Sequence, residues 1–113
     1  MAAQAPDRGD IVWLRFTPQT GHEQAGHRPA LVISPRTYNR KVGLALVCPI
    51  TSNVKGYPFE ARLPDGLQVS GAVLCDQIKS LDWRARNARR ICSAPTDVID
   101  EATAKLLTLV DPA

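Results

Sequence analysis

Short apolar runs punctuated by Pro, Gly and Asn constrain the fold of this chain more than any other feature of its sequence. β-branched and aliphatic residues fill these runs, which have the length of strands rather than of helices. Several short strands in one small sheet are therefore expected. The predicted strands are Ile11–Phe16, Ala30–Ser34, Val42–Ile50, Phe59–Leu63 and Val69–Cys75.

The first predicted strand is apolar on both of its faces. Ile11 and Trp13 lie on one face with Arg15, and apolar residues between them alternate onto the other face. A strand of this kind is expected to be buried within a barrel. Gly71, inside the last predicted strand, indicates a bulge or a close approach between two backbone segments.

The apolar residues change their period near the C-terminal end of the sequence. A stripe at helical spacing predicts one amphipathic helix. Pro95 suits the first turn of this helix, acidic residues such as Asp97 favour its N-terminal end, and Pro112 ends it. The stripe consists of Val98, Ile99, Ala102, Leu106, Leu109 and Val110.

A mainly β chain with one C-terminal helix fits an SH3-like small barrel, in a single domain over residues 1–113. The pattern alone leaves an OB-like barrel open. A chain of 113 residues suits one compact domain, and dimerisation would let it bury more apolar surface.

Charge and cysteine content narrow the class of protein. Lys and Arg number 14 against 11 Asp and Glu, and the resulting charge of +3 permits nucleic-acid binding without demanding it. The three cysteines lack Cys-x-x-Cys spacing, so small core residues are expected rather than disulfides or a zinc site. No segment reaches the roughly 20 apolar residues of a membrane span, and no signal sequence is visible. A cytoplasmic protein is expected.

Four motifs follow one another along the sequence. Gly9–Trp13 reads Gly-Asp-Ile-Val-Trp, and Glu23–Ala30 contains Gly-His-Arg-Pro. The third motif is Pro-Ile-Thr-Ser at Pro49–Ser52, followed by Lys-Gly-Tyr-Pro-Phe at Lys55–Phe59. The fourth, Asp76–Arg84, begins Asp-Gln-Ile-Lys-Ser. In order and spacing these motifs resemble those of MazF/PemK-type toxins, the mRNA interferases of type II toxin–antitoxin systems.

The resemblance implies an SH3-like barrel, a homodimer and a metal-independent endoribonuclease without a cofactor. It implies cleavage of single-stranded RNA, chiefly mRNA, at a short sequence, which inhibits translation and growth. It also implies a cognate MazE-like antitoxin whose flexible acidic tail covers the RNA groove.

RNA can be cut without a metal when its own 2′-hydroxyl attacks the adjacent phosphorus. The enzyme must deprotonate that hydroxyl, stabilise negative charge on the phosphoryl oxygens and protonate the departing 5′-oxygen. The products then carry a 2′,3′-cyclic phosphate and a 5′-hydroxyl.

Arg28 and Thr51 resemble the catalytic residues of the family. The planar guanidinium of Arg28 fits phosphate and is always charged, although a surface salt bridge is an alternative role. Thr51 is expected to donate to a phosphate oxygen rather than act as nucleophile, and a local bond to backbone is its alternative. Its neighbour Ser52 is expected in a turn.

Glu23 and His27 flank Arg28 and are the candidates for proton transfer. Glu23 either acts as the base or orients Arg28. His27 titrates near neutrality and either shuttles a proton or is a solvated loop residue. No catalytic role is assigned to His22. Two histidines without spaced acidic partners argue against a metal site.

RNA binding is expected to use basic and aromatic side chains. Phe16 is either a core residue, which is favoured, or a stacking platform. Asp76 and Gln77 either read base edges or lie in a dimer interface. The basic stretch 79–90 is a solvated face, a phosphate-binding patch or an antitoxin site, and Trp83 within it is expected to be structural. The candidate RNA-binding residues are Phe16, Lys55, Tyr57, Asp76, Gln77, Lys79, Arg84 and Arg86.

A non-enzymatic toxin that binds a protein target is the alternative function. CcdB-like gyrase poisons resemble the MazF/PemK family in fold but depend on a C-terminal Trp-Gly-Ile ending. This sequence ends in Leu-Val-Asp-Pro-Ala and contains Arg28 and Thr51, which favours the ribonuclease.

Overall fold

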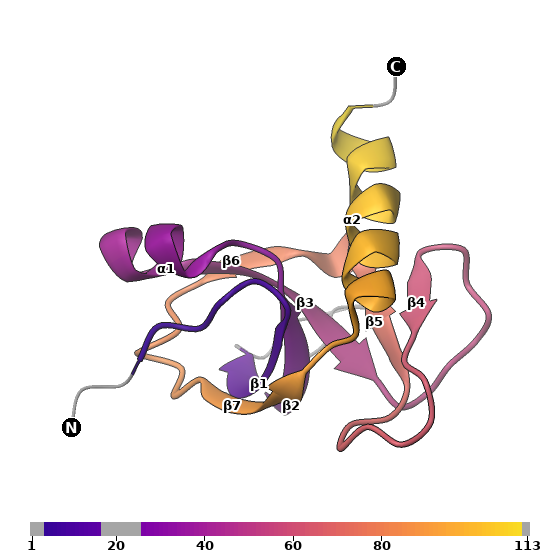
Figure 1. Cartoon of the computed structure of the whole chain (residues 1–113), viewed down its shortest axis with the longest axis horizontal. Coiled ribbons are helices and arrows are strands. Elements are labelled where there is room, and N and C mark those ends of the chain that lie inside the picture. Colours follow the sequence, from indigo (N-terminus) through magenta and orange to yellow (C-terminus); the bar gives the residue numbers. More distant parts are fainter. Residues whose placement is uncertain (1–3, 17–25, 112–113) are drawn as a thin grey trace.

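A computed structural model describes residues 4–16 and 26–111 of the chain. Figure 1 shows a strongly curved sheet with one long helix standing against it and a short helix at the other end of the molecule. In chain order the elements are β1 (Asp10–Phe16), β2 (Gly26–Val32), α1 (Arg36–Val42), β3 (Ala45–Thr51), β4 (Glu60–Arg62), β5 (Ala72–Leu74), the 3-10 turn η1 (Cys75–Gln77), β6 (Lys79–Leu81), β7 (Arg89–Ser93) and α2 (Thr96–Val110).

The strands pair in an antiparallel manner, in the order β4-β5-β3-β2-β1-β7 among the described residues. β3 pairs with β2 along one edge, with β6 near its start and with β5 at its end. A long strand shared between neighbours in this way bends the sheet towards a barrel. The predicted mainly β chain with a C-terminal helix is confirmed.

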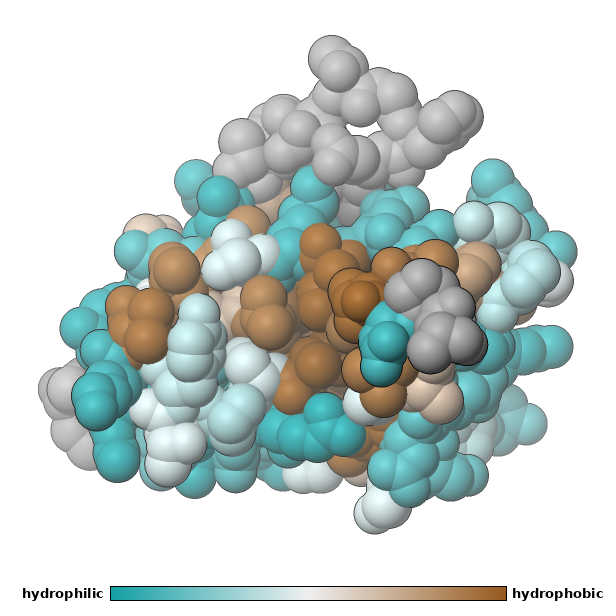
Figure 2. Space-filling model, turned by 90° about the horizontal axis from the view of Figure 1, so that it is seen from above, coloured by the Kyte–Doolittle hydropathy of each residue, from teal (hydrophilic) through white to brown (hydrophobic). Residues whose placement is uncertain are grey.

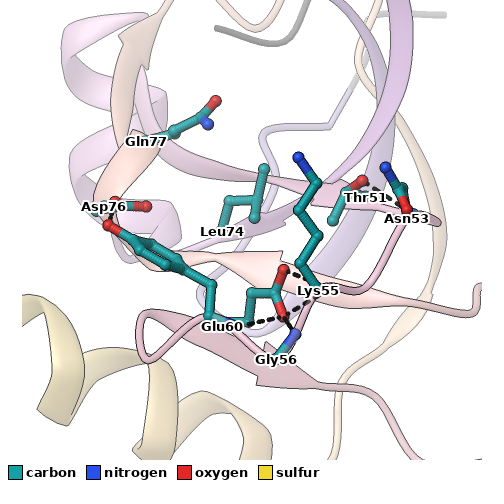
Figure 3. Close-up of a pocket in the computed structure, with 9 residues that line it drawn as sticks. Thr51, Asn53, Lys55, Gly56, Glu60, Leu74, Asp76 and Gln77 are labelled. Carbon is teal, nitrogen blue, oxygen red and sulfur yellow. Dashed lines mark hydrogen bonds between the residues drawn. The ribbon is translucent and has the colours of Figure 1, made fainter. Parts of the chain in front are cut away.

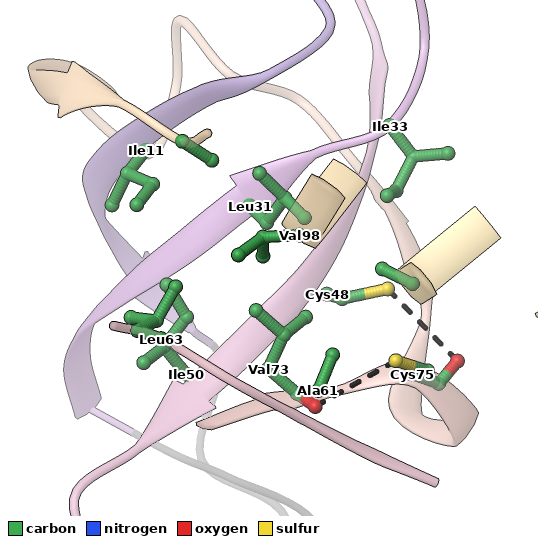
Figure 4. Packing of buried hydrophobic residues seen from close by; sticks show 12 residues of the cluster. Ile11, Leu31, Ile33, Cys48, Ile50, Ala61, Leu63, Val73, Cys75 and Val98 are labelled. Carbon is green, nitrogen blue, oxygen red and sulfur yellow. Dashed lines mark hydrogen bonds between the residues drawn. The ribbon is translucent and has the colours of Figure 1, made fainter. Parts of the chain in front are cut away.

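Two apolar clusters lie on opposite faces of this sheet. On the face covered by α2, Ile11 and Leu31 pack with Val98 in one apolar cluster (Figure 4). On the other face, Val12 and Phe16 belong to a second cluster. Neighbouring residues of one strand enter opposite clusters because side chains alternate between the two faces of a sheet. The central strands are therefore apolar throughout rather than alternating.

A short helix interrupts the segment predicted as one strand, Val42–Ile50. Val42 is the last residue of α1 and is 50% exposed, and β3 begins only after a turn. Pro35 precedes α1 in an extended conformation, and Gly43 ends it with a φ of 84°, where glycine is favoured. The prediction was wrong because an apolar residue at a helix end was read as part of the following strand.

Asn39, fully buried in α1, fastens this helix to distant parts of the chain. Its Nδ2 donates to the carbonyl oxygens of Pro6 and Ser34, at 2.8 and 3.0 Å. The backbone carbonyl oxygen of Asn39 accepts a hydrogen bond from Trp83 Nε1 at 2.9 Å. Buried polar groups need such partners, so Asn39 fixes where α1 lies. Trp83, which is 3% exposed, has the structural role expected of it.

The bounds of several strands differ from the predicted ones. β2 begins at Gly26 and ends before Ser34, and β5 has only three residues because Cys75 starts the turn η1. β1 is not buried on both faces throughout, since Trp13 is 41% exposed and Arg15 is exposed as well.

Two strands, β6 and β7, were not predicted from the sequence. β7 contains the exposed residues Arg89 and Arg90 and pairs with β1. β6 consists of Lys79, Ser80 and Leu81 and pairs with β3. Neither strand has the run of apolar residues from which the other strands were predicted. Backbone hydrogen bonds pair them with the sheet, and such bonds do not require apolar side chains.

The predicted C-terminal helix is confirmed, and it starts one residue after Pro95. Val98 and Ala102 are buried against the sheet, whereas the last turns of α2 extend beyond it. Leu109 and Val110, which the predicted stripe included, are 48% and 68% exposed there, so the stripe is buried only in the earlier turns of the helix. Leu107, which was not part of the stripe, is 51% exposed. Pro112 lies outside the described residues. Within the described residues, 4–16 and 26–111, no helix is long and apolar enough to span a membrane.

Gly71 makes the close backbone approach that the sequence suggested. Its φ is 119°, and a Cβ added there would lie 2.0 Å from the carbonyl oxygen of Thr51. We expect Gly71→Ala to lower the free energy of unfolding by about 3 kcal/mol, because it adds overpacking to an unfavourable backbone conformation. Chemical denaturation measures the loss.

Gly66→Ala is the matched control for this substitution. Gly66 also has a positive φ of 94°, but nothing lies within 4 Å of an added Cβ. We expect a loss of only about 1 kcal/mol from the backbone conformation. Equal losses for the two variants would contradict the role of the Thr51 contact.

Candidate active site

A pocket of about 570 Å³ opens where β3 ends, beside η1 and the loop that leads into β4 (Figure 3). Five of the sequence-predicted site residues line it, and they come from separate parts of the chain. Asn53, Glu60 and Leu74 also line it and were not predicted. The lining residues are Thr51, Asn53, Lys55, Gly56, Tyr57, Glu60, Leu74, Asp76 and Gln77.

Thr51 is the last residue of β3 and is 7% exposed. Its Oγ1 accepts a hydrogen bond from the backbone N–H of Asn53 at 3.1 Å, which is the local turn contact considered as an alternative. A hydroxyl that accepts one hydrogen bond still has its own O–H to donate. The turn contact therefore orients the Thr51 hydroxyl as a donor and is compatible with the catalytic role.

The strand register relates Arg28 to Thr51. Ala30 of β2 lies opposite Pro49 of β3, and this pairing runs on through Val32 opposite Val47. Extending the same antiparallel register by two residues sets Arg28 opposite Thr51. Directly opposed residues point to the same face of a sheet. Half-buried Arg28 and buried Thr51 thus lie two residues beyond the last β2–β3 pair, and only Thr51 is among the residues that line the pocket.

Glu60 organises the loop between β3 and β4 from beneath. Its side chain is buried, and its carboxylate accepts hydrogen bonds from the backbone N–H groups of Lys55, Gly56 and Tyr57. Hydrogen bonds to a charged acceptor are stronger than those between neutral groups. The carboxylate thus holds the loop that presents the Lys55 and Tyr57 side chains at the pocket.

Tyr57 and Asp76 form a hydrogen bond at the pocket rim. The Tyr57 hydroxyl donates to Asp76 Oδ2 at 2.8 Å, and its ring lies 5.8 Å from that of Phe59. This hydrogen bond, together with the negative charge of Asp76, raises the pKa of Tyr57 above the ordinary value of 10.0. The phenol is therefore protonated throughout the neutral range.

His27 lies between two donors on the outer face of β1 and β2. Trp13 Nε1 is 3.0 Å from its Nδ1, and Arg15 Nε is 3.3 Å from its Nε2. Both ring nitrogens of His27 are therefore in contact with side chains of β1. Trp13 and Arg15 were not identified as partners of His27, because a cross-strand contact needs a register that the sequence does not specify.

The remaining candidates are spread over other parts of the molecule. Phe16 is 1% exposed, so it belongs to the core and offers no stacking face. The guanidinium of Arg84 lies 4.9 Å from the Trp83 ring centroid, and Arg86 Nη1 donates to the carbonyl of Arg15. Lys79 is half-buried in β6. Glu23 and His22 lie outside the described residues.

Two buried thiols near the pocket take no part in its chemistry. Burial raises the pKa of Cys48 to about 12 and that of Cys75 to about 11. A protonated thiol is a poor nucleophile, so both act as small core residues. Cys92 is half-buried. Over the described ranges, no three His, Cys, Asp or Glu side chains are grouped to hold a metal ion.

Comparison with known proteins decides the family. A family model described as "PemK-like, MazF-like toxin of type II toxin-antitoxin system" matches residues 7–110. The chain belongs to this toxin family. Endoribonuclease toxin MazF of Escherichia coli strain K12 is 46% identical over 105 residues, which cover 93% of this chain and 94% of that protein. Endoribonuclease toxin ChpB of the same strain is 40% identical over 111 residues, with coverages of 93% and 94%.

Solved structures agree with this assignment. Crystalline MazF from Deinococcus radiodurans is 57% identical, has a TM-score of 0.90 and matches over 94% of this chain and 96% of its own. A MazE–MazF structure from the same organism is 55% identical, has a TM-score of 0.87 and matches over 96% and 98%. The small barrel of the MazF/PemK family, expected from the resemblance, is confirmed.

The Tyr57–Asp76 contact predicts a pH effect. We expect Asp76→Asn to lower the pKa of Tyr57 towards 10.0, because it removes the acceptor's negative charge. Since the folded pKa is raised, the contact stabilises the fold below pH 10 or so and loses its effect as the pH rises through the folded pKa. Phenolate absorbance, with the Tyr57→Phe titration subtracted, measures the shift. An unchanged Tyr57 curve in Asp76→Asn would contradict the contact.

Proposed function

We propose that this chain is a sequence-specific endoribonuclease toxin that cuts single-stranded RNA, chiefly mRNA, without a metal ion. The observation that carries the proposal is one pocket lined by Thr51 together with the polar side chains of Lys55, Tyr57, Asp76 and Gln77. The names of its relatives support the activity, since MazF and ChpB are both endoribonuclease toxins.

Arg28 and Thr51 supply charge stabilisation in the proposed mechanism. As the 2′-hydroxyl of RNA attacks the neighbouring phosphorus, negative charge develops on the phosphoryl oxygens. The Arg28 guanidinium offers paired N–H donors to them, and the Thr51 hydroxyl, oriented by Asn53, offers one more. Donors held in place before the reaction stabilise that charge without having to reorganise. The leaving 5′-oxygen departs as the 2′,3′-cyclic phosphate closes.

His27 and Glu23 are proposed for the two proton transfers, one from the attacking 2′-hydroxyl and one to the departing 5′-oxygen, which leaves as a 5′-hydroxyl. Contacts of its two ring nitrogens with Trp13 and Arg15 hold the His27 ring in place. Glu23 precedes Arg28 by five positions and serves either as the general base or as the residue that orients Arg28. Product ends are a 2′,3′-cyclic phosphate and a 5′-hydroxyl.

RNA binding extends from the catalytic pair along the pocket. Lys55 neutralises phosphate, the exposed Tyr57 ring stacks on a base, and the polar ends of Asp76 and Gln77 read base edges. Exposed Arg84, with Arg86 and Lys79, adds positive charge beyond the pocket. Cleavage of mRNA in the cytoplasm would stop translation and growth.

A cognate antitoxin is the proposed protein partner. The MazE–MazF structures of Deinococcus radiodurans support a MazE-like protein in this role. A flexible acidic tail of the antitoxin would compete with RNA for the same basic side chains, because both ligands are polyanions.

Arg28→Ala and Thr51→Ala test the mechanism. We expect kcat to fall about 1,000-fold and about 100-fold respectively, since each removes a donor to the developing charge. The assay incubates a long single-stranded RNA with purified protein in EDTA and maps the cut sites and end groups. Cuts at one recurring sequence with cyclic phosphate and 5′-hydroxyl ends are expected from the wild type.

Arg40→Ala is the matched control, because it removes an exposed arginine from α1, away from the pocket. It should cut like the wild type. Full cleavage by folded Arg28→Ala protein would exclude the proposed role of Arg28. Absence of cleavage by the folded wild type would favour a toxin that binds a protein target, and gyrase inhibition would then be measured.

Self-association through α2 is part of the proposal. Leu107, Leu109 and Val110 are 48–68% exposed in the last turns of this helix. Figure 2, a view from above, shows hydrophobic side chains gathered on the face towards which α2 points. An uncharged apolar patch can pack against its own copy without charge repulsion. A homodimer would cover it.

Val110→Lys tests the homodimer. We expect its dissociation constant to rise at least about 10-fold, because a charge would be buried without a partner. Thr108→Lys places the same charge in the same turn but on another side of α2, and it should leave the constant unchanged. Sedimentation equilibrium measures both. A dimer equally strong in Val110→Lys would move the interface elsewhere.

A further inference from the structure

Glu60 is a carboxylate kept away from water beneath the pocket loop. Glu60 is only 6% exposed, and backbone N–H groups of the loop contact its carboxylate oxygens. Oε1 accepts from the N–H of Gly56 at 2.9 Å and from that of Tyr57 at 3.2 Å. The N–H of Lys55 lies 3.3 Å from Oε1 and 3.2 Å from Oε2. Figure 3 shows these bonds converging on one carboxylate.

The loop backbone is shaped to bind this anion. Gly56 has a φ of 78°, a left-handed conformation that lets successive N–H groups point to the same side. Such a concave array of N–H groups favours a negative charge. No side chain other than a carboxylate offers both the charge and two acceptor oxygens at this position.

The outward side of the same loop faces the pocket. The Lys55 and Tyr57 side chains are exposed, and both line the space that also borders Thr51. Their backbone N–H groups are the ones bound by Glu60. The position of each Cα, and with it the reach of each side chain over the pocket, is therefore fixed from behind by one carboxylate.

β4 is attached to the rest of the fold by contacts other than the Glu60 carboxylate. The backbone carbonyl of Glu60 accepts a hydrogen bond from Lys105 Nζ at 2.7 Å, which joins β4 to α2. Lys105 also pairs with Glu101 at 3.0 Å. The main chain of Glu60 thus serves the fold, and its side chain serves the loop.

We propose that Glu60 is a positioning residue for RNA binding, which sets Lys55 and Tyr57 at the pocket by holding the backbone of the loop. This inference rests on the proposed function. It predicts that loss of the Glu60 charge weakens binding of the substrate and leaves the chemistry at Arg28 and Thr51 intact.

Glu60→Gln tests the inference with a side chain of the same size. We expect KM for a single-stranded RNA oligonucleotide to rise about 10-fold while kcat stays within about twofold, the pattern of a lost binding interaction. We also expect amide hydrogen exchange at Gly56 and Tyr57, measured without RNA, to become about 10-fold faster or more, with β3 unchanged.

Glu101→Gln is the matched control, because it removes the same charge from the Lys105 neighbourhood without touching the loop. It should change neither KM nor loop exchange by more than about twofold. Glu60→Asp keeps the charge but is one methylene shorter, so its hydrogen bonds lengthen, and a rise in KM of about threefold is expected. This variant decides the matter if Glu60→Gln does not fold.

Three outcomes would be decisive. A fall in kcat with unchanged KM in Glu60→Gln or Glu60→Asp would overturn the positioning role. Faster loop exchange with unchanged KM would overturn it as well and leave the proposed function standing. Absence of RNA cleavage by the wild-type chain would instead overturn the proposed function.

Discussion

The backbone pairing of β3 is the constraint on which the rest of the structure depends. Its middle section pairs with β2, its start with β6 and its end with β5. The side chains of this strand enter both apolar clusters, so its position is fixed from two faces and two edges. Thr51 ends the strand at the point where the ladder to β2 has run out. A side chain placed there is held by the whole sheet, yet it lines a pocket.

The sequence allowed the prediction of those parts of the fold that rest on apolar burial. The runs that became β1 to β5 and the first turns of α2 bury side chains at a regular period, which produces a recognisable sequence pattern. β6 and β7 rest on backbone pairing under charged residues, and α1 rests on Pro35, Gly43 and the amide of Asn39. Interactions of this kind join distant segments and produce no periodicity. They could be found only in three dimensions.

In the candidate site, too, some residues could be predicted from sequence motifs and others only from contacts in the folded chain. Thr51, Lys55, Tyr57, Asp76 and Gln77 were recognised through motifs and do line one pocket. Phe16 was ambiguous because its place at a strand end fits either core or surface, and burial decided for the core. Glu60 was missed because nothing in the sequence distinguishes a glutamate whose carboxylate turns inward to a loop from one that is solvated. Its role depends on three backbone N–H groups that converge only in the folded chain.

The arrangement of charge reconciles a pocket that contains two carboxylates with the polyanionic substrate proposed for it. Unpartnered, Glu60 and Asp76 would repel phosphate over a short distance. The Glu60 carboxylate instead accepts hydrogen bonds from the N–H groups of the loop, and the Asp76 carboxylate accepts one from the Tyr57 hydroxyl. Both carboxylates are thereby engaged from within the protein, which leaves the charge of Lys55 to act on an incoming phosphate. Asp76 differs from Glu60 in being exposed, so a base with a hydrogen-bond donor on its edge could take the place of Tyr57. The two acidic residues thus separate into one that shapes the pocket and one that is available to its ligand.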